Sequence, residues 1–264
     1  MPAASHITPE LLQQRLDTLA HQLMQRDDAL ALLALGSVGL ETDRVDAWSD
    51  LDFFVLVRAG AKQRYIGQLD WLAAAHPLVW HFQNTVDGHK ALMEDGVLCE
   101  FAVFELHELA HIPYAAGRFI WRRSEVDPAL ASPKLALPGP HDAHWLVGEA
   151  LSNLLVGLQR YARGEKLAAM RLVQVHALDR VLELLESRQP QTLTAFANAS
   201  RDPFNIDRRI EKRNIHAAAA LPDWAGGYEA TVPAALSLLT ALEAHGGVNA
   251  AIAARIRLLA TMAK

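Results

Sequence analysis

Two stretches decide the fold of this chain: ALLALGS at residues 31–37 and SDLDFFVLV at residues 49–57. Each contains a continuous apolar run of the kind that forms a buried strand. The first run ends in a Gly-Ser turn at Gly36 and Ser37, and the second begins with Asp50 and Asp52. Because side chains alternate between the two faces of a strand, the two carboxylates are expected on the same face.

The chemistry of these residues points to a metal ion and a phosphate. Two carboxylates held side by side repel each other unless a cation neutralises them, and Mg²⁺ prefers carboxylate oxygens, water and phosphate as ligands. Glycine permits a tight turn whose backbone N–H groups face an anion, so Gly36 and Ser37 suit a phosphate. Arg44, in the loop between the strands, is either a further phosphate contact or a surface arginine. The pattern therefore predicts chemistry on a nucleoside triphosphate.

This arrangement resembles the signature of the nucleotidyltransferase superfamily with the DNA polymerase β-like fold, in which a Gly-Ser turn precedes Asp-x-Asp. Within that superfamily the chain is most similar to the antibiotic nucleotidyltransferases, and to the lincosamide-modifying branch in particular. The closer resemblance rests on residues 49–52, on SNL at 152–154 and on RGE at 163–165. The loop from Ser37 to Asp50 is slightly longer than in the commonest family version.

The resemblance implies a function as well as a fold. It implies transfer of a nucleoside monophosphate, usually AMP from ATP, to a hydroxyl of a small molecule such as a lincosamide or aminoglycoside antibiotic, with pyrophosphate leaving. Asp50 and Asp52 are then metal ligands, and Gly36 and Ser37 position the phosphates of ATP. Glu100 is the expected third acid, which completes metal binding or accepts the hydroxyl proton. Homodimers are common among such enzymes.

The residues around Glu100 support its selection. It lies in the apolar run 97–104, directly after a hairpin signal, and it is flanked by Cys99 and Phe101. A carboxylate in such surroundings is costly to bury without a partner, which favours a metal or proton-transfer role over a solvent-facing one. Glu149 is the alternative general base, although a solvated helix face is the favoured interpretation of that residue.

Composition limits the class of protein. Hydrophobic residues make up 51% of the 264 residues, which is enough for a substantial core. The net charge of −5 argues against an extended nucleic-acid surface and tolerates a cationic small substrate. The single cysteine excludes an intrachain disulfide and fits a reducing compartment. The N-terminus lacks the features of a signal peptide and no apolar run is long enough to span a bilayer, so we expect a soluble cytoplasmic protein without a membrane partner.

The expected fold class is α+β, with a mixed sheet and flanking helices followed by a helical bundle. Over residues 1–127, a nucleotidyltransferase domain, the patterns predict helices at 8–26 and 63–75, strands at 29–35, 52–57 and 78–82, and a hairpin over 90–104. A proline-rich linker follows at 128–139. Residues 140–264 read as a helical bundle domain, with helices expected at 141–163, 166–188, 206–220, 232–244 and 248–262. The substrate cleft is expected between the domains or between two chains.

Other functions stay open at this point. His107, Glu108 and His111 match the HExxH pattern of zinc hydrolases, but Pro113 restricts any helix there and no histidine follows at the extended spacing. A toxin–antitoxin nucleotidyltransferase that modifies a protein or RNA would use the same chemistry as an antibiotic-modifying enzyme. A catalytically silent binding module is a third alternative, which the presence of all three acids disfavours.

Overall fold

The computed structural model describes residues 7–135, 139–187 and 205–262. The chain divides into two compact units, Met1–Leu137 and Pro138–Lys264. In the described part of the chain, the first unit contains a six-stranded mixed sheet with helices and the second contains helices alone. The predicted α+β class is confirmed.

The sheet has the strand order β3-β4-β5-β2-β1-β6. The parallel pair β2 and β5 lies at its centre, and the other neighbouring strands are antiparallel. Because parallel strands run in the same direction, the ends at which β2 and β5 begin lie side by side. The strand bounds are β1 Ala29–Ala34, β2 Leu51–Val57, β3 Leu78–Gln83, β4 Gly88–Met93, β5 Leu98–Glu105 and β6 Arg118–Arg122.

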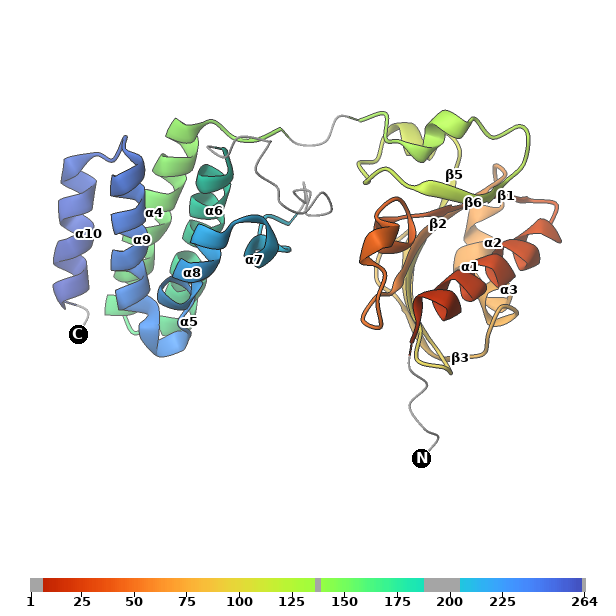
Figure 1. Cartoon of the computed structure of the whole chain (residues 1–264), viewed down its shortest axis with the longest axis horizontal. Coiled ribbons are helices and arrows are strands. Elements are labelled where there is room, and N and C mark those ends of the chain that lie inside the picture. The colour runs from red at the N-terminus through yellow and green to blue at the C-terminus, as the bar shows by residue number, and fades with distance from the viewer. Residues whose placement is uncertain (1–6, 136–138, 188–204, 263–264) are drawn as a thin grey trace. The chain divides into compact units, whose positions relative to one another are not determined.

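One face of the sheet packs against three helices, α1 Pro9–Met24, α2 Lys62–Gly67 and α3 Asp70–Ala73 (Figure 1). Alternate residues of the central strands fill this core, and the stacked rings of Phe53 and Phe101 lie 5.3 Å apart. The Thr8 side chain caps α1 by accepting a hydrogen bond from the backbone N–H of Leu11. The prediction of a single helix over 63–75 is wrong, because the chain leaves the helical conformation between α2 and α3 and forms two helices.

The opposite face is covered in part by the segment that follows β5. This segment contains the 3₁₀ helices η3 Glu108–Ala110 and η4 Pro128–Ala131, and it buries Leu109 and Leu130 against the second core of the unit. Strand β6, which the sequence analysis did not predict, lies within it and pairs with β1. Since Leu130 is buried, packed structure of the first unit continues beyond residue 127.

The second unit is a set of packed helices with its own core. Their bounds are α4 Ala143–Ala162, α5 Lys166–Arg171, the π-helix η5 Leu172–Ala177, α6 Leu178–Ser187, α7 Ile210–Arg213, α8 Ile215–Trp224, η6 Tyr228–Ala230, α9 Thr231–His245 and α10 Ala250–Met262. The helix expected over 206–220 is divided at Asn214, whose side chain caps α8 by accepting from the N–H of Ala217. Residue 188, the expected end of an earlier helix, lies outside the described residues. No helix of the described ranges is both long and apolar enough to cross a membrane.

Candidate active site

A row of polar side chains crosses the sheet on the face opposite α1. Asp52 of β2 lies directly opposite Glu100 of β5, and Glu100 lies directly opposite Lys90 of β4. Residues that face each other across neighbouring strands project on the same side of a sheet. The sequence analysis grouped Glu100 with Asp52 as expected metal-binding acids, and the register makes the two residues immediate partners.

Lys90 is a residue that the sequence analysis did not single out. Its Nζ lies 2.9 Å from Oε2 of Glu100, and both side chains are half exposed. The hydrogen bond and charge of Glu100 raise the pKa of Lys90 above its ordinary value, and the charges of Asp52 and Asp50 add smaller contributions. Glu100 therefore interacts with a cation of the protein itself. The available signal was the alternation in β4, where Lys90 lies between residues of the buried face.

Asp50 occupies the position just before β2 and is half buried. The side chains of the described residues form no group of three or more His, Cys, Asp or Glu that could hold a metal ion. The expected cage of three acids, Asp50, Asp52 and Glu100, is therefore not assembled in this conformation. A magnesium site needs less from the protein, because Mg²⁺ is commonly held by one or two carboxylates together with water and substrate phosphates.

The Gly36 turn lies directly against Asp52. The N–H of Leu35 donates to the backbone oxygen of Asp52 at 2.8 Å, which continues the pairing of β1 with β2 up to the turn. Gly36 has a φ of +54°, and a Cβ at this position would lie 3.2 Å from Oδ2 of Asp52. The following residues form the 3₁₀ helix η1 Gly36–Val38, closed by a 3.1 Å hydrogen bond from the N–H of Gly39 to the Gly36 oxygen. The absence of a side chain at Gly36 thus brings the turn close to the carboxylate.

Arg118 of β6 forms hydrogen bonds to the backbone of this turn. Its Nε donates to the backbone oxygens of Val38 at 3.2 Å and Gly39 at 2.9 Å, and its Nη2 donates to Gln13 of α1 at 2.9 Å. The sequence analysis missed this role because it missed β6. The alternating aromatic and β-branched residues of RFIWR at 118–122 were the signal that could have found it.

Arg44 and Glu149 have different surroundings. The Arg44 guanidinium forms an ion pair with Glu41 of the same loop. Arg44 is the last residue of the 3₁₀ helix η2 Thr42–Arg44, and Glu41 directly precedes that helix. The Nε of Arg44 is buried without a hydrogen-bond partner among the described residues. Glu149 is exposed on α4, in the second unit. Neither residue is part of the row that contains Asp52.

The geometry around Glu108 does not support zinc hydrolysis. The segment forms only the short 3₁₀ helix η3, which does not provide the stable helix that an HExxH site requires. Glu108 is already bound by Lys62, whose Nζ lies 2.6 Å from Oε1, and its Oε2 accepts the N–H of Glu105. A zinc hydrolase needs three protein ligands, and no such group occurs within residues 7–135, 139–187 and 205–262.

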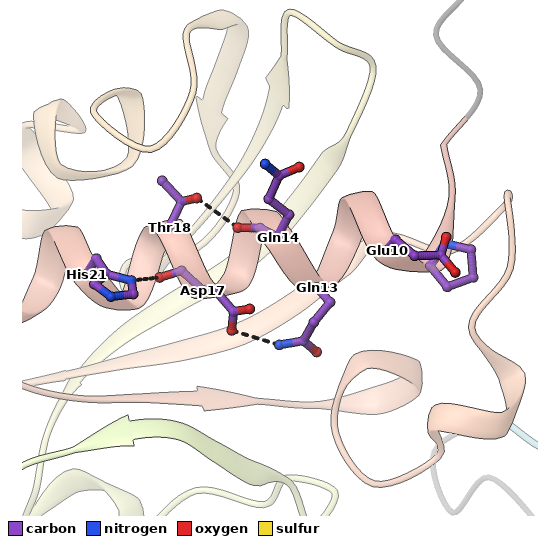
Figure 2. A pocket seen from close by; sticks show the side chains of 7 residues that line it. Glu10, Gln13, Gln14, Asp17, Thr18 and His21 are labelled. Atoms are coloured by element: carbon purple, nitrogen blue, oxygen red, sulfur yellow. Dashed lines mark hydrogen bonds between the residues drawn. The ribbon is translucent and has the colours of Figure 1, made fainter.

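Two further hollows lie away from this row of polar side chains. A shallow groove of about 590 Å³ follows the exposed side of α1. Figure 2 shows that its polar groups bond within the helix, with Gln13 donating to Asp17 at 2.8 Å and Thr18 donating to the Gln14 oxygen. Nothing in this groove converges on a ligand. A second hollow, of about 710 Å³, lies in the helical unit and is lined by Tyr161, Leu236 and Arg257 among others.

Comparison with known proteins gives no family assignment. No protein-family model matches the chain, and no curated protein matches it. Solved structures that align with most of it include the following two. One is an aminoglycoside 6-adenyltransferase from Bacillus subtilis, with 10% identity, 94% of this chain and 90% of that chain covered, and a TM-score of 0.33. The other is a STING-associated CdnE c-di-GMP synthase from Capnocytophaga granulosa, with 12% identity, 98% of this chain and 81% of that chain covered, and a TM-score of 0.31. Both TM-scores are low, so these likenesses carry no argument about function.

Proposed function

We propose that the chain is a Mg²⁺-dependent nucleotidyltransferase that transfers AMP from ATP to a hydroxyl of a small molecule, with antibiotics of the lincosamide or aminoglycoside type as the acceptors to test first. The observation that carries the proposal is the juxtaposition of three groups. Asp52 and Glu100 are direct neighbours across the parallel pair, and the Gly36 turn approaches Oδ2 of Asp52. In this proposal the first unit is the nucleotidyltransferase domain and the second is a separate helical domain.

The residues present fit a magnesium ion. Asp50 and Asp52 offer only oxygen ligands, which suit a hard cation, and the missing side chain at Gly36 leaves space beside Oδ2 of Asp52. These two carboxylates would hold the ion, with ATP oxygens and water completing its coordination. When bound, the ion supplies charge neutralisation at the α-phosphate and at the departing pyrophosphate.

The residues of the chain then have distinct tasks. The backbone N–H groups of the turn at Gly36 and Ser37 orient the β- and γ-phosphates. The acceptor oxygen forms a bond to the α-phosphorus while the bond to the pyrophosphate oxygen breaks, and Glu100 accepts the hydroxyl proton. Lys90 positions the Glu100 carboxylate through their ion pair. Positioning of this kind accounts for much of the rate in phosphoryl transfer, because little covalent work is left to the protein.

A mass measurement tests the proposal. The protein is incubated with Mg·ATP and a panel of lincosamides, aminoglycosides and other hydroxyl compounds, and each acceptor is examined for a mass gain equal to AMP. We expect one class of acceptor to gain that mass with the wild-type protein, and we expect at least about a 10³-fold lower rate with Asp52→Asn, because metal charge stabilisation is worth several kcal/mol. The matched control is Asp27→Asn, which neutralises an exposed carboxylate of the same unit. Equal rates for the wild-type protein and Asp52→Asn would contradict the assignment.

A further inference from the structure

Strand β3 exposes two aromatic side chains. Trp80 is 48% exposed and Phe82 is 47% exposed, and their ring centroids lie 5.4 Å apart. Leu98 of β5 is 37% exposed. Large apolar side chains gathered on one exposed surface mark a binding site more often than chance exposure does. This patch therefore needs an explanation.

The register of the sheet joins this patch to the candidate active site. Phe82 lies directly opposite Lys90, which extends the row of Asp52, Glu100 and Lys90 to the edge strand. A second, parallel row places Trp80 opposite Leu92 and Leu92 opposite Leu98. We call Trp80, Phe82, Leu92 and Leu98 the aromatic strip. It lies on the same face of the sheet as the candidate catalytic acids.

The strand order determines which substrate the aromatic strip would meet. The Gly36 turn follows β1, on one side of Asp52, and the aromatic strip spans β5, β4 and β3 on the other side. In phosphoryl transfer the attacking and leaving oxygens lie roughly in line across the phosphorus atom. With pyrophosphate held at the Gly36 turn, the acceptor must approach from the side of β5. That approach leads across Glu100 to the aromatic strip.

We propose that the aromatic strip binds the acceptor, and that the acceptor is a hydroxyl compound with an apolar ring remote from the reacting hydroxyl. This inference rests on the proposed function. Three strand spacings separate β3 from β2, which corresponds to about 14 Å between Phe82 and Asp52. An acceptor that reaches both is about two linked rings long. The ion pair of Lys90 and Glu100 lies between them, so a polar middle of the acceptor without net charge matches this surface. These properties favour an acceptor with an apolar ring over a polycationic aminoglycoside.

The size of the strip argues against a second copy of the chain as its occupant. Half-exposed aromatic and leucine side chains of this number present on the order of 300 Å² of apolar surface. A stable protein–protein interface buries roughly 800 Å² on each partner. Closure of such an interface would also bury Lys90, Glu100 and Asp52, with the cost of removing charged groups from water. A small molecule needs no larger apolar area than the strip provides.

The experiment compares the double variant Trp80→Ala/Phe82→Ala with Val86→Ala. Val86 is also apolar and is 78% exposed, but it lies in the turn between β3 and β4 and outside both rows. The probe is 8-anilinonaphthalene-1-sulfonate, a two-ring-system fluorophore that binds apolar surfaces. We expect the double variant to bind it about tenfold more weakly than the wild-type protein and Val86→Ala to bind it unchanged. Circular dichroism verifies that the variants are folded, which we expect because the altered side chains are exposed.

A second readout assigns the occupant. For an acceptor that gains AMP in the mass assay, the double variant should raise the acceptor KM about tenfold while leaving the KM for ATP unchanged, and Mg·ATP should not displace the probe. Displacement of the probe by Mg·ATP would make the strip a nucleobase site and overturn the inference. Dimerisation of the wild-type protein that the double variant abolishes in light scattering would also overturn it, as would unchanged probe binding. Failure of the proposed function is seen separately, as absence of AMP transfer by the wild-type protein.

Discussion

At the residue scale, the close approach of the turn to Asp52 depends on the absence of a side chain at Gly36. Gly36→Ala adds a Cβ that would lie 3.2 Å from Oδ2 of Asp52 at a φ of +54°. A non-glycine residue in this left-handed region costs about 1 kcal/mol of stability, and the added methyl also disturbs the candidate metal ligand. We expect Gly36→Ala to lose both stability in urea unfolding and most nucleotidyl transfer.

Gly60→Ala is the matched control for that loss. Gly60 has a φ of +83°, and a Cβ there would have no neighbour within 4 Å. It should lose a similar amount of stability, about 1 kcal/mol, and retain activity. If the two variants retained equal activity, the close approach of the turn to Asp52 would have no functional role.

Glu100 allows a sharper test of the proton acceptor. Glu100→Gln keeps the size of the side chain and removes its basic carboxylate, so the rate should fall by at least about 10²-fold. Glu94→Gln, on an exposed position of the neighbouring hairpin turn, should leave the rate unchanged. A near-wild-type rate for Glu100→Gln in the AMP transfer assay would exclude Glu100 as the general base.

Residues of the candidate site differ in how far sequence could predict them. One local sequence pattern contains Gly36, Ser37, Asp50 and Asp52. The spacing of these residues along the chain was enough to predict them as site residues. Lys90 becomes relevant only through its register with Glu100 across two strands. Arg118 likewise depends on pairing of β6 with β1, which no local pattern specifies.

At the scale of elements, strand β5 contains a thiol whose ionisation is suppressed. Burial raises the pKa of Cys99 to about 12, and nearby carboxylates contribute in the same direction. An unfolded thiol ionises near pH 8.5, so above that pH the unfolded state has lost a proton that the folded state keeps. The stability from this group is complete below about pH 8.5 and declines as the pH rises toward 12.

The predicted pH dependence is measurable. Between pH 7.5 and 9.5, the free energy of unfolding of the wild-type protein should fall by about 1 kcal/mol more than that of Cys99→Ala. Urea unfolding of both proteins at the two pH values gives this difference directly. Equal losses for the two proteins would mean that the Cys99 thiol ionises as readily in the folded state as in the unfolded one.

In the helical unit, Gln174 links the π-helix η5 to the start of α9. Its Nε2 donates to the oxygen of Gly227 at 2.7 Å and to Oγ1 of Thr231 at 3.2 Å, and its Oε1 accepts from the N–H of Gly227 at 2.9 Å. Gln174→Leu would remove all three hydrogen bonds of this buried side chain, one of them to the buried Thr231, at a cost of about 1–3 kcal/mol. Thermal unfolding should show this loss. The control is Gln159→Leu, at a half-exposed position of α4, which should change the stability by much less.

The elements themselves were predicted best where their patterns are long. The leucine stripe of α1 and the apolar runs of β1 and β2 gave their positions to within a residue or two. The breaks between α2 and α3 and at Asn214 were missed, because an apolar period can continue through a break in the backbone. Strand β6 was missed although its aromatic and β-branched residues were a usable signal, because arginine occupies both of its ends.

At the scale of the whole molecule, composition predicted the class of protein. A chain with 51% hydrophobic residues supports more than one core, and each unit has its own. The change to alanine- and leucine-rich helical patterns near residue 140 marks the change from sheet to helices. The aromatic strip could not be predicted, because exposure of Trp80 and Phe82 depends on which strand occupies the edge of the sheet.

The central claim is that Asp50 and Asp52 hold a metal-bound triphosphate against the Gly36 turn. Calorimetric titration of ATP into the wild-type protein and into Asp52→Asn, each with and without Mg²⁺, tests it without any knowledge of the acceptor. We expect the wild-type protein to bind ATP in a Mg²⁺-dependent manner and Asp52→Asn to lose that dependence while remaining folded. ATP binding that is equally tight in both proteins, or indifferent to Mg²⁺, would contradict the claim.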